Sequence, residues 1–205
     1  MIAQIERRVS PVGLSPREAA FVTGLPEKTI NQAIDRAEVQ TLPTRRIEDR
    51  ERTLAFPELV YLRLRGEVGE LLSPEGKRKL RHELSAVTLE EEFDVVRVGP
   101  LEIRLSPCLT GLRERLEELD RVWSFITIDP NIRAGEPVVR GTRIGVHALG
   151  DLARQGASTE ELLEDHPALT RESLEAALAW DQLHPRRGRP PRAELKNGTV
   201  IRRGP

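Results

Sequence analysis

Helix-start signals recur along this chain and limit the elements that it can form. Ser15-Pro16-Arg17-Glu18 combines an N-cap serine, a proline at the first helical position and an acid three residues after the cap. Ser73-Pro74 begins another helix in the same way, Ser158 precedes a further one, and Thr170 caps a last helix that ends at Leu183. These helix-start signals predict a mainly helical chain built from short helices.

The first of these helices is followed at once by a second. Gly24 can take the left-handed conformation that ends a helix, and Pro26 starts a helix to about Arg36. Ala20 is small enough for the two helices to approach, and Ile30 supplies a branched apolar anchor. The spacing predicts a helix-turn-helix, although short helical hairpins with a glycine turn also occur without DNA binding.

The second helix of this pair has two chemically different faces. Ile30, Ala33 and Ile34 are expected to face inward. The polar side chains then face outward, where asparagine and glutamine suit adenine edges and lysine suits guanine or phosphate. The predicted DNA-contacting residues of this helix are Lys28, Thr29, Asn31, Gln32 and Arg36.

A charged segment follows between two short expected strands, Val39–Leu42 and Thr53–Phe56. It forms a wing-like hairpin whose arginines are expected to contact phosphate. Three acidic residues alternate with these arginines, so a self-paired surface loop is the alternative interpretation. The wing arginines are Arg45, Arg46, Arg50 and Arg52.

The next part of the chain predicts helix, hairpin and helix. Ser73–Leu84 is helical, residues 88–105 form an antiparallel hairpin that turns at Gly99-Pro100, and apolar residues then recur at spacings of three and four. This apolar stripe either packs on the chain's own core or forms a subunit interface. Its members are Leu109, Leu112, Leu116, Leu119 and Trp123, and the alternating hairpin residues are Phe93, Val95, Val98, Leu101, Ile103 and Leu105.

The segment from about Phe125 to Leu183 carries the most specific pattern. Short strands and turns lead to Ile144, and three helices follow. Gly135, Pro137, Gly141 and Thr142 are expected to fix the turns, and Arg143 to bind a nearby carbonyl or carboxylate rather than DNA. The expected core comprises Ala148, Leu149, Leu152, Leu162, Leu163, Leu169, Leu174, Ala177 and Leu178.

The last helix of this segment is expected to expose Arg171, Glu172, Glu175 and Asp181. Such an acidic face would repel phosphate. We therefore expect this module to dimerise rather than to contact DNA, and prefer it to the leucine stripe as the subunit interface.

Two parts of the chain resemble known families. The helix, turn, helix, wing, helix order of the first 65 residues resembles the winged helix-turn-helix of the MerR and excisionase type. The string Asp129-Pro130, Gly135, Pro137 and Gly141-Thr142-Arg143-Ile144, followed by Glu160-Glu161, Pro167, Leu169-Thr170 and Ala177-Leu178, resembles a small bacterial domain of formerly unknown function, classed as helix-turn-helix-like and found in VapB-type antitoxins. The resemblance implies an antitoxin, with operator double-stranded DNA and a PIN-like (VapC-type) ribonuclease toxin as partners.

Charge is unevenly spread along the chain. Residues 184–205 contain seven basic residues and one acid, which leaves 25 basic and 32 acidic residues elsewhere. A basic tail on an acidic body indicates an anionic partner. Given the resemblance, we expect this tail to occupy the acidic site of the ribonuclease, and a solvated or DNA-grazing tail is the alternative. The predicted toxin-binding residues are Arg186, Arg187, Arg189, Arg192, Leu195, Val200, Ile201, Arg202 and Arg203.

Several classes of protein are excluded by the residues that the chain lacks. The single cysteine, Cys108, cannot form an internal disulfide, and four scattered histidines give no metal-ligand spacing. No catalytic constellation and no cofactor motif can be assembled. Without an apolar run of roughly 20 residues or a secretory signal, the expected location is the cytoplasm, with no membrane partner.

These observations predict a mainly α chain with short β-hairpins (α+β), in which two helix-turn-helix-like domains are joined by a hairpin and a helix. The expected parts are a winged helix-turn-helix at 1–70, a connection at 71–124, a dimerising domain at 125–183 and a flexible basic tail at 184–205. The expected function is that of a homodimeric antitoxin and autorepressor without enzymatic activity. The alternative is a stand-alone dimeric transcriptional regulator with no toxin partner.

Overall fold

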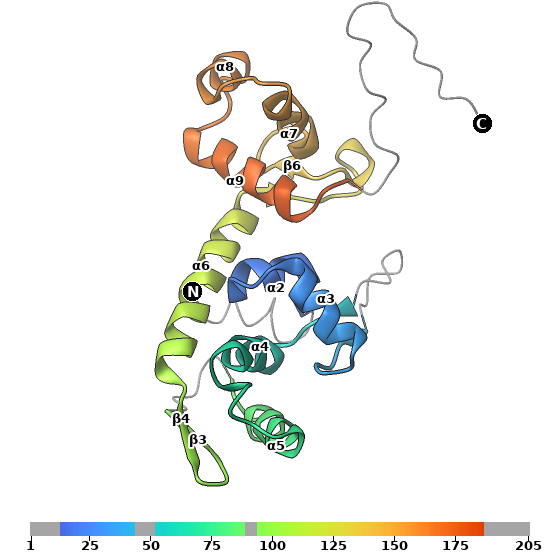
Figure 1. Cartoon of the computed structure of the whole chain (residues 1–205). Helices are drawn as coiled ribbons and strands as arrows, with labels where there is room; N and C mark the ends of the chain where they lie inside the picture. Colours follow the sequence, from blue (N-terminus) through green and yellow to red (C-terminus); the bar gives the residue numbers. More distant parts are fainter. Residues whose placement is uncertain (1–12, 44–51, 89–93, 187–205) are drawn as a thin grey trace, which may run out of the picture.

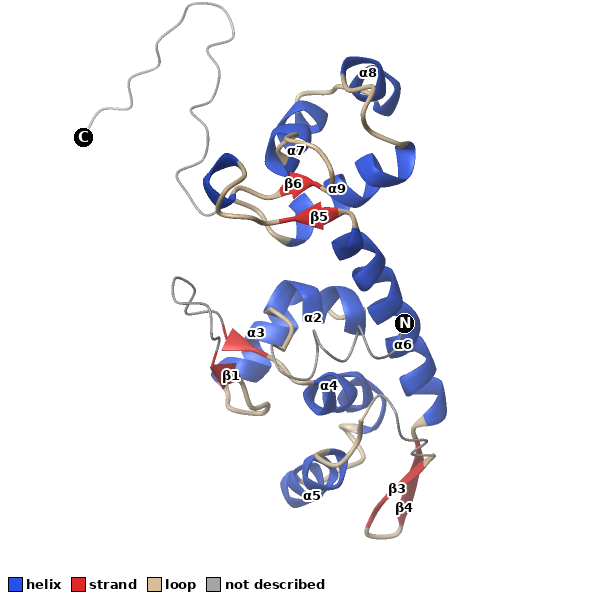
Figure 2. Cartoon of the chain, turned by 180° about the vertical axis from the view of Figure 1, so that it is seen from behind, coloured by secondary structure: helices blue, strands red, loops and turns tan. Residues whose placement is uncertain are grey.

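A computed structural model describes residues 13–43, 52–88 and 94–186 of the chain. Helix α6 (Ser106–Ser124) runs as a long rod along the group formed by α2 to α5 and leads at its carboxyl end into the group formed by α7 to α9 (Figures 1 and 2). The strands are short and form two-stranded antiparallel sheets. The expected class, mainly α with short β-hairpins, is confirmed.

The first helical pair forms as the local signals predict. Helix α2 (Pro16–Thr23) begins at Ser15, whose hydroxyl accepts a hydrogen bond from the Glu18 backbone amide, while the Glu18 carboxylate accepts one from the Ser15 amide. It ends at Gly24, where φ is +69°. Helix α3 (Glu27–Asp35) then begins after Pro26.

The wing strands are shorter than predicted. Strand β1 (Leu42–Pro43) pairs antiparallel with β2 (Arg52–Thr53), instead of Val39–Leu42 with Thr53–Phe56. Leu54 forms only an isolated bridge with Leu14, and Phe56 already belongs to the next helix, because Pro57 fixes a helical φ in its first turn. Arg45, Arg46 and Arg50 lie outside the described residues.

The remaining elements of the first half pack around this pair. Helix α4 (Phe56–Val68) is followed by α5 (Pro74–Leu84), which Ser73 caps, and by the hairpin of β3 (Val95–Val98) and β4 (Leu101–Arg104). The apolar face of the hairpin includes Val96 in place of the predicted Val95, since Val96 is buried and Val95 is 38% exposed. Phe93 lies outside the described residues.

The second half begins with β5 (Ile126–Thr127) and β6 (Val138–Val139), which pair around a 3-10 turn, η1 (Arg133–Gly135). Helices α7 (Val146–Arg154), α8 (Thr159–Asp165) and α9 (Arg171–Leu183) follow. Ser158 and Thr170 cap α8 and α9 through reciprocal hydrogen bonds, as the sequence predicts.

Two hydrophobic cores lie along α6. The first core joins buried residues from Leu14 to Leu119. The segment 71–124 therefore shares one core with helices α2 to α4, which precede it. The second extends from Ile126 to Trp180, and the half-buried Trp123 packs against both. Leu109, Leu112, Leu116 and Leu119 are all buried in the first core, which leaves this stripe unavailable as a subunit interface.

Three expectations for the second core are wrong. Ala148 and Leu152 are exposed, because α7 turns His147, Leu149 and Gly150 toward α9 instead. Asp181, expected on the surface, is 2% exposed. Leu149, Leu162, Leu169, Leu174 and Ala177 are buried as predicted, and Leu163 and Leu178 pack against them.

Candidate nucleic-acid interface and domain junction

Helix α3 presents a polar face on an apolar base. Ile30 and Ala33 are fully buried and Ile34 is 7% exposed, as the sequence predicts. Of the predicted DNA-contacting residues in this helix, Lys28, Gln32 and Arg36 are exposed, and Thr29 and Asn31 are half-buried. The helix therefore offers solvent a row of side chains that can donate and accept hydrogen bonds.

The carboxyl end of α3 is held by two neighbouring helices. Arg81 of α5 donates to the Glu38 carbonyl at 2.5 Å, and Arg65 of α4 pairs with the Glu38 carboxylate at 2.6 Å. Between α3 and this anchor, Ala37 has a φ of +52°, which a non-glycine residue keeps only when its surroundings enforce it. These contacts fix the direction in which α3 points.

Basic residues flank this face. Arg52 of β2 pairs with Asp35 at the end of α3, at 2.8 Å, so one predicted wing arginine already has an acidic partner in the free protein. Helix α5, which Arg81 joins to the segment after α3, carries the half-buried Lys77 and the exposed Arg78 and Lys79. The sequence prediction missed this second basic surface, although the run Lys77-Arg78-Lys79 was its signal.

Turns built on glycine and threonine fix the β5–β6 hairpin of the second half. Gly135 and Gly141 have φ values of +85° and +77°, and the Thr142 hydroxyl donates to the Val139 carbonyl at 2.8 Å. Arg143 is exposed, and it is Arg140 that donates to backbone carbonyls, those of Ser124 and Ile126. Pro137 is half-buried and its carbonyl accepts a hydrogen bond from Val146.

A buried ion cluster joins α7 to α9. The Asp181 carboxylate lies 2.5 Å from Nδ1 of His147 and also accepts a hydrogen bond from Arg154. Gly150 lies directly against the same carboxylate. The sequence carried a signal for the burial of Asp181, which shares its helix face with Leu174 and Ala177 at spacings of three and four, but none for its partners on α7.

A second polar cluster lies where α2, α6 and α9 meet. Oε1 of Glu18 accepts hydrogen bonds from the Trp123 indole at 3.0 Å and from Nε2 of His184 at 3.2 Å. Trp180 stacks on His184 with ring centroids 4.3 Å apart, and Trp123 meets both rings edge-on. The residue that caps the first helix of the helix-turn-helix is thus also the polar link to α9.

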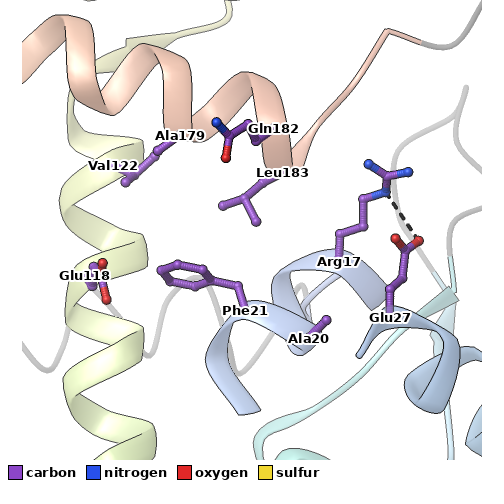
Figure 3. A pocket seen from close by; sticks show the side chains of 9 residues that line it. All are labelled: Arg17, Ala20, Phe21, Glu27, Glu118, Val122, Ala179, Gln182 and Leu183. Carbon is purple, nitrogen blue, oxygen red and sulfur yellow. Dashed lines mark ion pairs between the residues drawn. The ribbon is translucent and has the colours of Figure 1, made fainter. Parts of the chain in front are cut away.

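A groove of about 370 Å³ opens beside this cluster (Figure 3). Its floor is apolar, with Phe21 of α2, Val122 of α6 and Leu183 of α9 facing one another, and its rim carries Arg17 paired with Glu27 at 3.3 Å. The groove lies between the helix-turn-helix and the last helix, so the two halves of the chain do not close completely against each other there.

The start of the basic tail contacts the second half of the chain. Arg186 pairs with Glu136 at 2.6 Å and lies 4.0 Å from Asp151. The other predicted toxin-binding residues, Arg187, Arg189, Arg192, Leu195, Val200, Ile201, Arg202 and Arg203, lie outside the described residues.

Residues 13–43, 52–88 and 94–186 contain no cluster of three or more histidine, cysteine or acidic side chains able to hold a metal ion. Of the helices described there, none has both the length and the apolar composition needed to span a bilayer.

Comparison with known proteins gives one family match, in the second half of the chain. Residues 126–180 match DUF433, a family described as protein of unknown function. The uncharacterized protein y4eO of Sinorhizobium fredii is 37% identical over 102 residues, which are 49% of this chain and 46% of that protein. The chain therefore spans about half the length of this curated relative. A crystal structure of Rv2018 from Mycobacterium tuberculosis aligns over 80% of this chain and 95% of that one, with 15% identity and a TM-score of 0.34.

Proposed function

We propose that this protein is a DNA-binding regulator of the antitoxin type, which binds operator DNA as a homodimer in the cytoplasm and neutralises a PIN-like ribonuclease through its basic tail. The observation that carries the proposal is the α2–turn–α3 unit. Its base is anchored by Ile30, Ala33 and Ile34, and it offers Lys28 and Gln32 to solvent. A helix of this width and polarity fits the major groove of duplex DNA.

The charge around α3 supports binding to the phosphate backbone. Lys77, Arg78 and Lys79 of α5 extend the basic surface beyond α3, and Arg52 lies at the start of β2. Because Asp35 already pairs with Arg52, DNA must compete for that guanidinium. We therefore expect α5 to contribute more to the salt dependence of binding than Arg52 does.

Matched glutamine substitutions test the DNA-binding proposal. Gln32→Ala should weaken binding to the cognate operator by about 1–3 kcal/mol and relax base preference at one position. Gln182→Ala removes another glutamine, exposed on α9 and away from the proposed dimer surface, and should leave binding unchanged. Equal losses on cognate and scrambled duplexes would assign Gln32 to the backbone, and no loss at all would remove α3 from the interface.

The antitoxin part of the proposal rests on the tail and on the family resemblance of the second half. Truncation tests it, and the cut should follow Arg186, because His184 and Arg186 contact the folded chain. The truncated protein should bind operator normally but fail to protect against the neighbouring ribonuclease on co-expression. If no neighbouring gene product associates with the full-length chain, the protein is a stand-alone regulator.

The surface proposed for dimerisation lies on α7. Ala148 and Leu152 are exposed one turn apart, and Leu152 is 38% exposed. The leucine stripe of α6 is already buried in the first core and is not available for dimerisation. Pairing through the second half would place two α3 helices on the outside of the dimer, as palindromic half-sites require.

A further inference from the structure

His184 has an acceptor at each of its two ring nitrogens. Nε2 faces the Glu18 carboxylate at 3.2 Å, and Nδ1 faces the Trp180 carbonyl at 3.1 Å. A neutral imidazole carries one N–H and can donate to only one of them, whereas the imidazolium donates from both nitrogens. The contacts at this position therefore match the protonated ring.

The carboxylate opposite this ring is held in its charged form. Burial by itself raises the pKa of Glu18, but hydrogen bonds from His184, Ser15 and Trp123, together with the charge of His184, lower that pKa below its usual value. Glu18 is 7% exposed, so its charge is poorly screened by water. The electrostatic interaction between Glu18 and His184 therefore depends strongly on whether the His184 ring carries a charge.

The other charged groups near the junction already have partners of their own. On α2, Arg17 pairs with Glu27 of α3. On α9, Asp181 is bound by His147 and Arg154 of α7. Beyond α9, Arg186 pairs with Glu136 and lies near Asp151. On α6, Glu118 pairs with Arg115 at 3.2 Å. Among the described residues, Glu18 is the charged group that contacts the His184 ring.

Glu18 and His184 belong to elements that are far apart in the sequence. Glu18 lies in the first turn of α2, and His184 directly follows α9. We propose that protonated His184 is a positioning residue that holds the helix-turn-helix against the DUF433 domain, and that loss of its proton loosens this junction. The consequence for DNA rests on the proposed function: in a dimer paired through the second half, the junction sets the separation of the two α3 helices.

Tryptophan emission of the full-length protein tests the junction without DNA. Trp123 and Trp180 are the two tryptophans of the chain, and both rings contact His184. A charged ring beside an indole changes its emission, so the emission should change when the His184 ring loses its proton. His184→Gln should abolish this transition, and His82→Gln, which alters an exposed histidine on α5, should preserve it.

Glu18→Gln sharpens the same experiment. Removing the carboxylate charge should alter the transition, because Nε2 of His184 then lacks its charged acceptor. Persistence of the transition in His184→Gln would assign it to His147, whose ring lies 5.7 Å from that of Trp180, and would overturn the proposal. Absence of any transition in the parent protein would also overturn it.

Operator affinity measured at pH 6 and pH 8 tests the positioning role. The ratio of the two affinities should be at least threefold larger for the parent than for His184→Gln. His184→Arg, a permanent cation, should keep at pH 8 the affinity that the parent has at pH 6. Equal ratios in all three proteins would overturn the positioning role. A clear emission transition without binding to any duplex would refute the proposed function and leave the proton-dependent junction standing.

Discussion

Alanine at Gly150 should destabilise this protein, although alanine normally stabilises a helix. Gly150 lies in the middle of α7, where replacement of glycine ordinarily adds about 1 kcal/mol. Here the new Cβ would lie 3.0 Å from Oδ1 of Asp181 and closer still to Oδ2. The methyl group would therefore push the buried carboxylate away from His147 and Arg154.

The magnitude follows from two costs. Overpacking a core by one methyl group costs about 1–3 kcal/mol. A buried charge that loses its partner costs about 3–5 kcal/mol, and we take the low end because the Arg154 side chain is 58% exposed and its charge is screened by solvent. After the helix gain of about 1 kcal/mol is subtracted, Gly150→Ala should lower the free energy of unfolding by about 3–5 kcal/mol.

Urea unfolding followed by far-ultraviolet circular dichroism measures this loss. Gly111→Ala is the matched control, since Gly111 is exposed within α6 and its added Cβ meets no atom within 4 Å. The control should stabilise the protein by about 0.5–1 kcal/mol. If Gly150→Ala is as stable as the parent, the close packing of α7 against Asp181 is wrong.

Three further outcomes are expected. Ala134 has a φ of +56° in the exposed η1 turn, so Ala134→Gly should raise the free energy of unfolding by up to about 1 kcal/mol. Ala148→Gly, on the exposed face of α7, should lower it by about 0.5–1 kcal/mol. Thermal unfolding of the two variants distinguishes backbone strain from helix propensity. Leu152→Asp should give a folded monomer in analytical ultracentrifugation, and a persistent dimer would place the interface elsewhere. Burial raises the pKa of the Cys108 thiol to about 11, so a thiol reagent at pH 8 should label the native protein on the order of a hundredfold more slowly than the unfolded chain, and rapid native labelling would contradict this burial.

The helices could be predicted from the sequence because their signals are local. Ser15, Ser73, Ser158 and Thr170 each satisfy backbone amides within their own first turn, so no distant contact is needed to place them. The inward face of α3 follows in the same way from the spacing of its apolar residues.

The contacts between elements could not be predicted in this way. Asp181 is buried because His147 and Arg154, some 30 residues earlier, neutralise and hydrogen-bond it, and a helical pattern of charges gives no sign of such partners. Leu152 is exposed because α7 uses His147 and Gly150 to pack against α9. Glu18 could be recognised as a capping acid, but its links to Trp123 and His184 bridge more than 100 residues of sequence.

Helix α6 also determines when the chain can fold during its synthesis. The core that supports the helix-turn-helix is completed by Leu112, Leu116 and Leu119, and 84 residues separate the last of these from Asp35 at the end of α3. At about 5–20 residues per second, the ribosome needs roughly 4–17 s to add them. Until α6 emerges, the nascent helix-turn-helix therefore lacks part of its core, and its uncovered apolar face is accessible to chaperones and proteases.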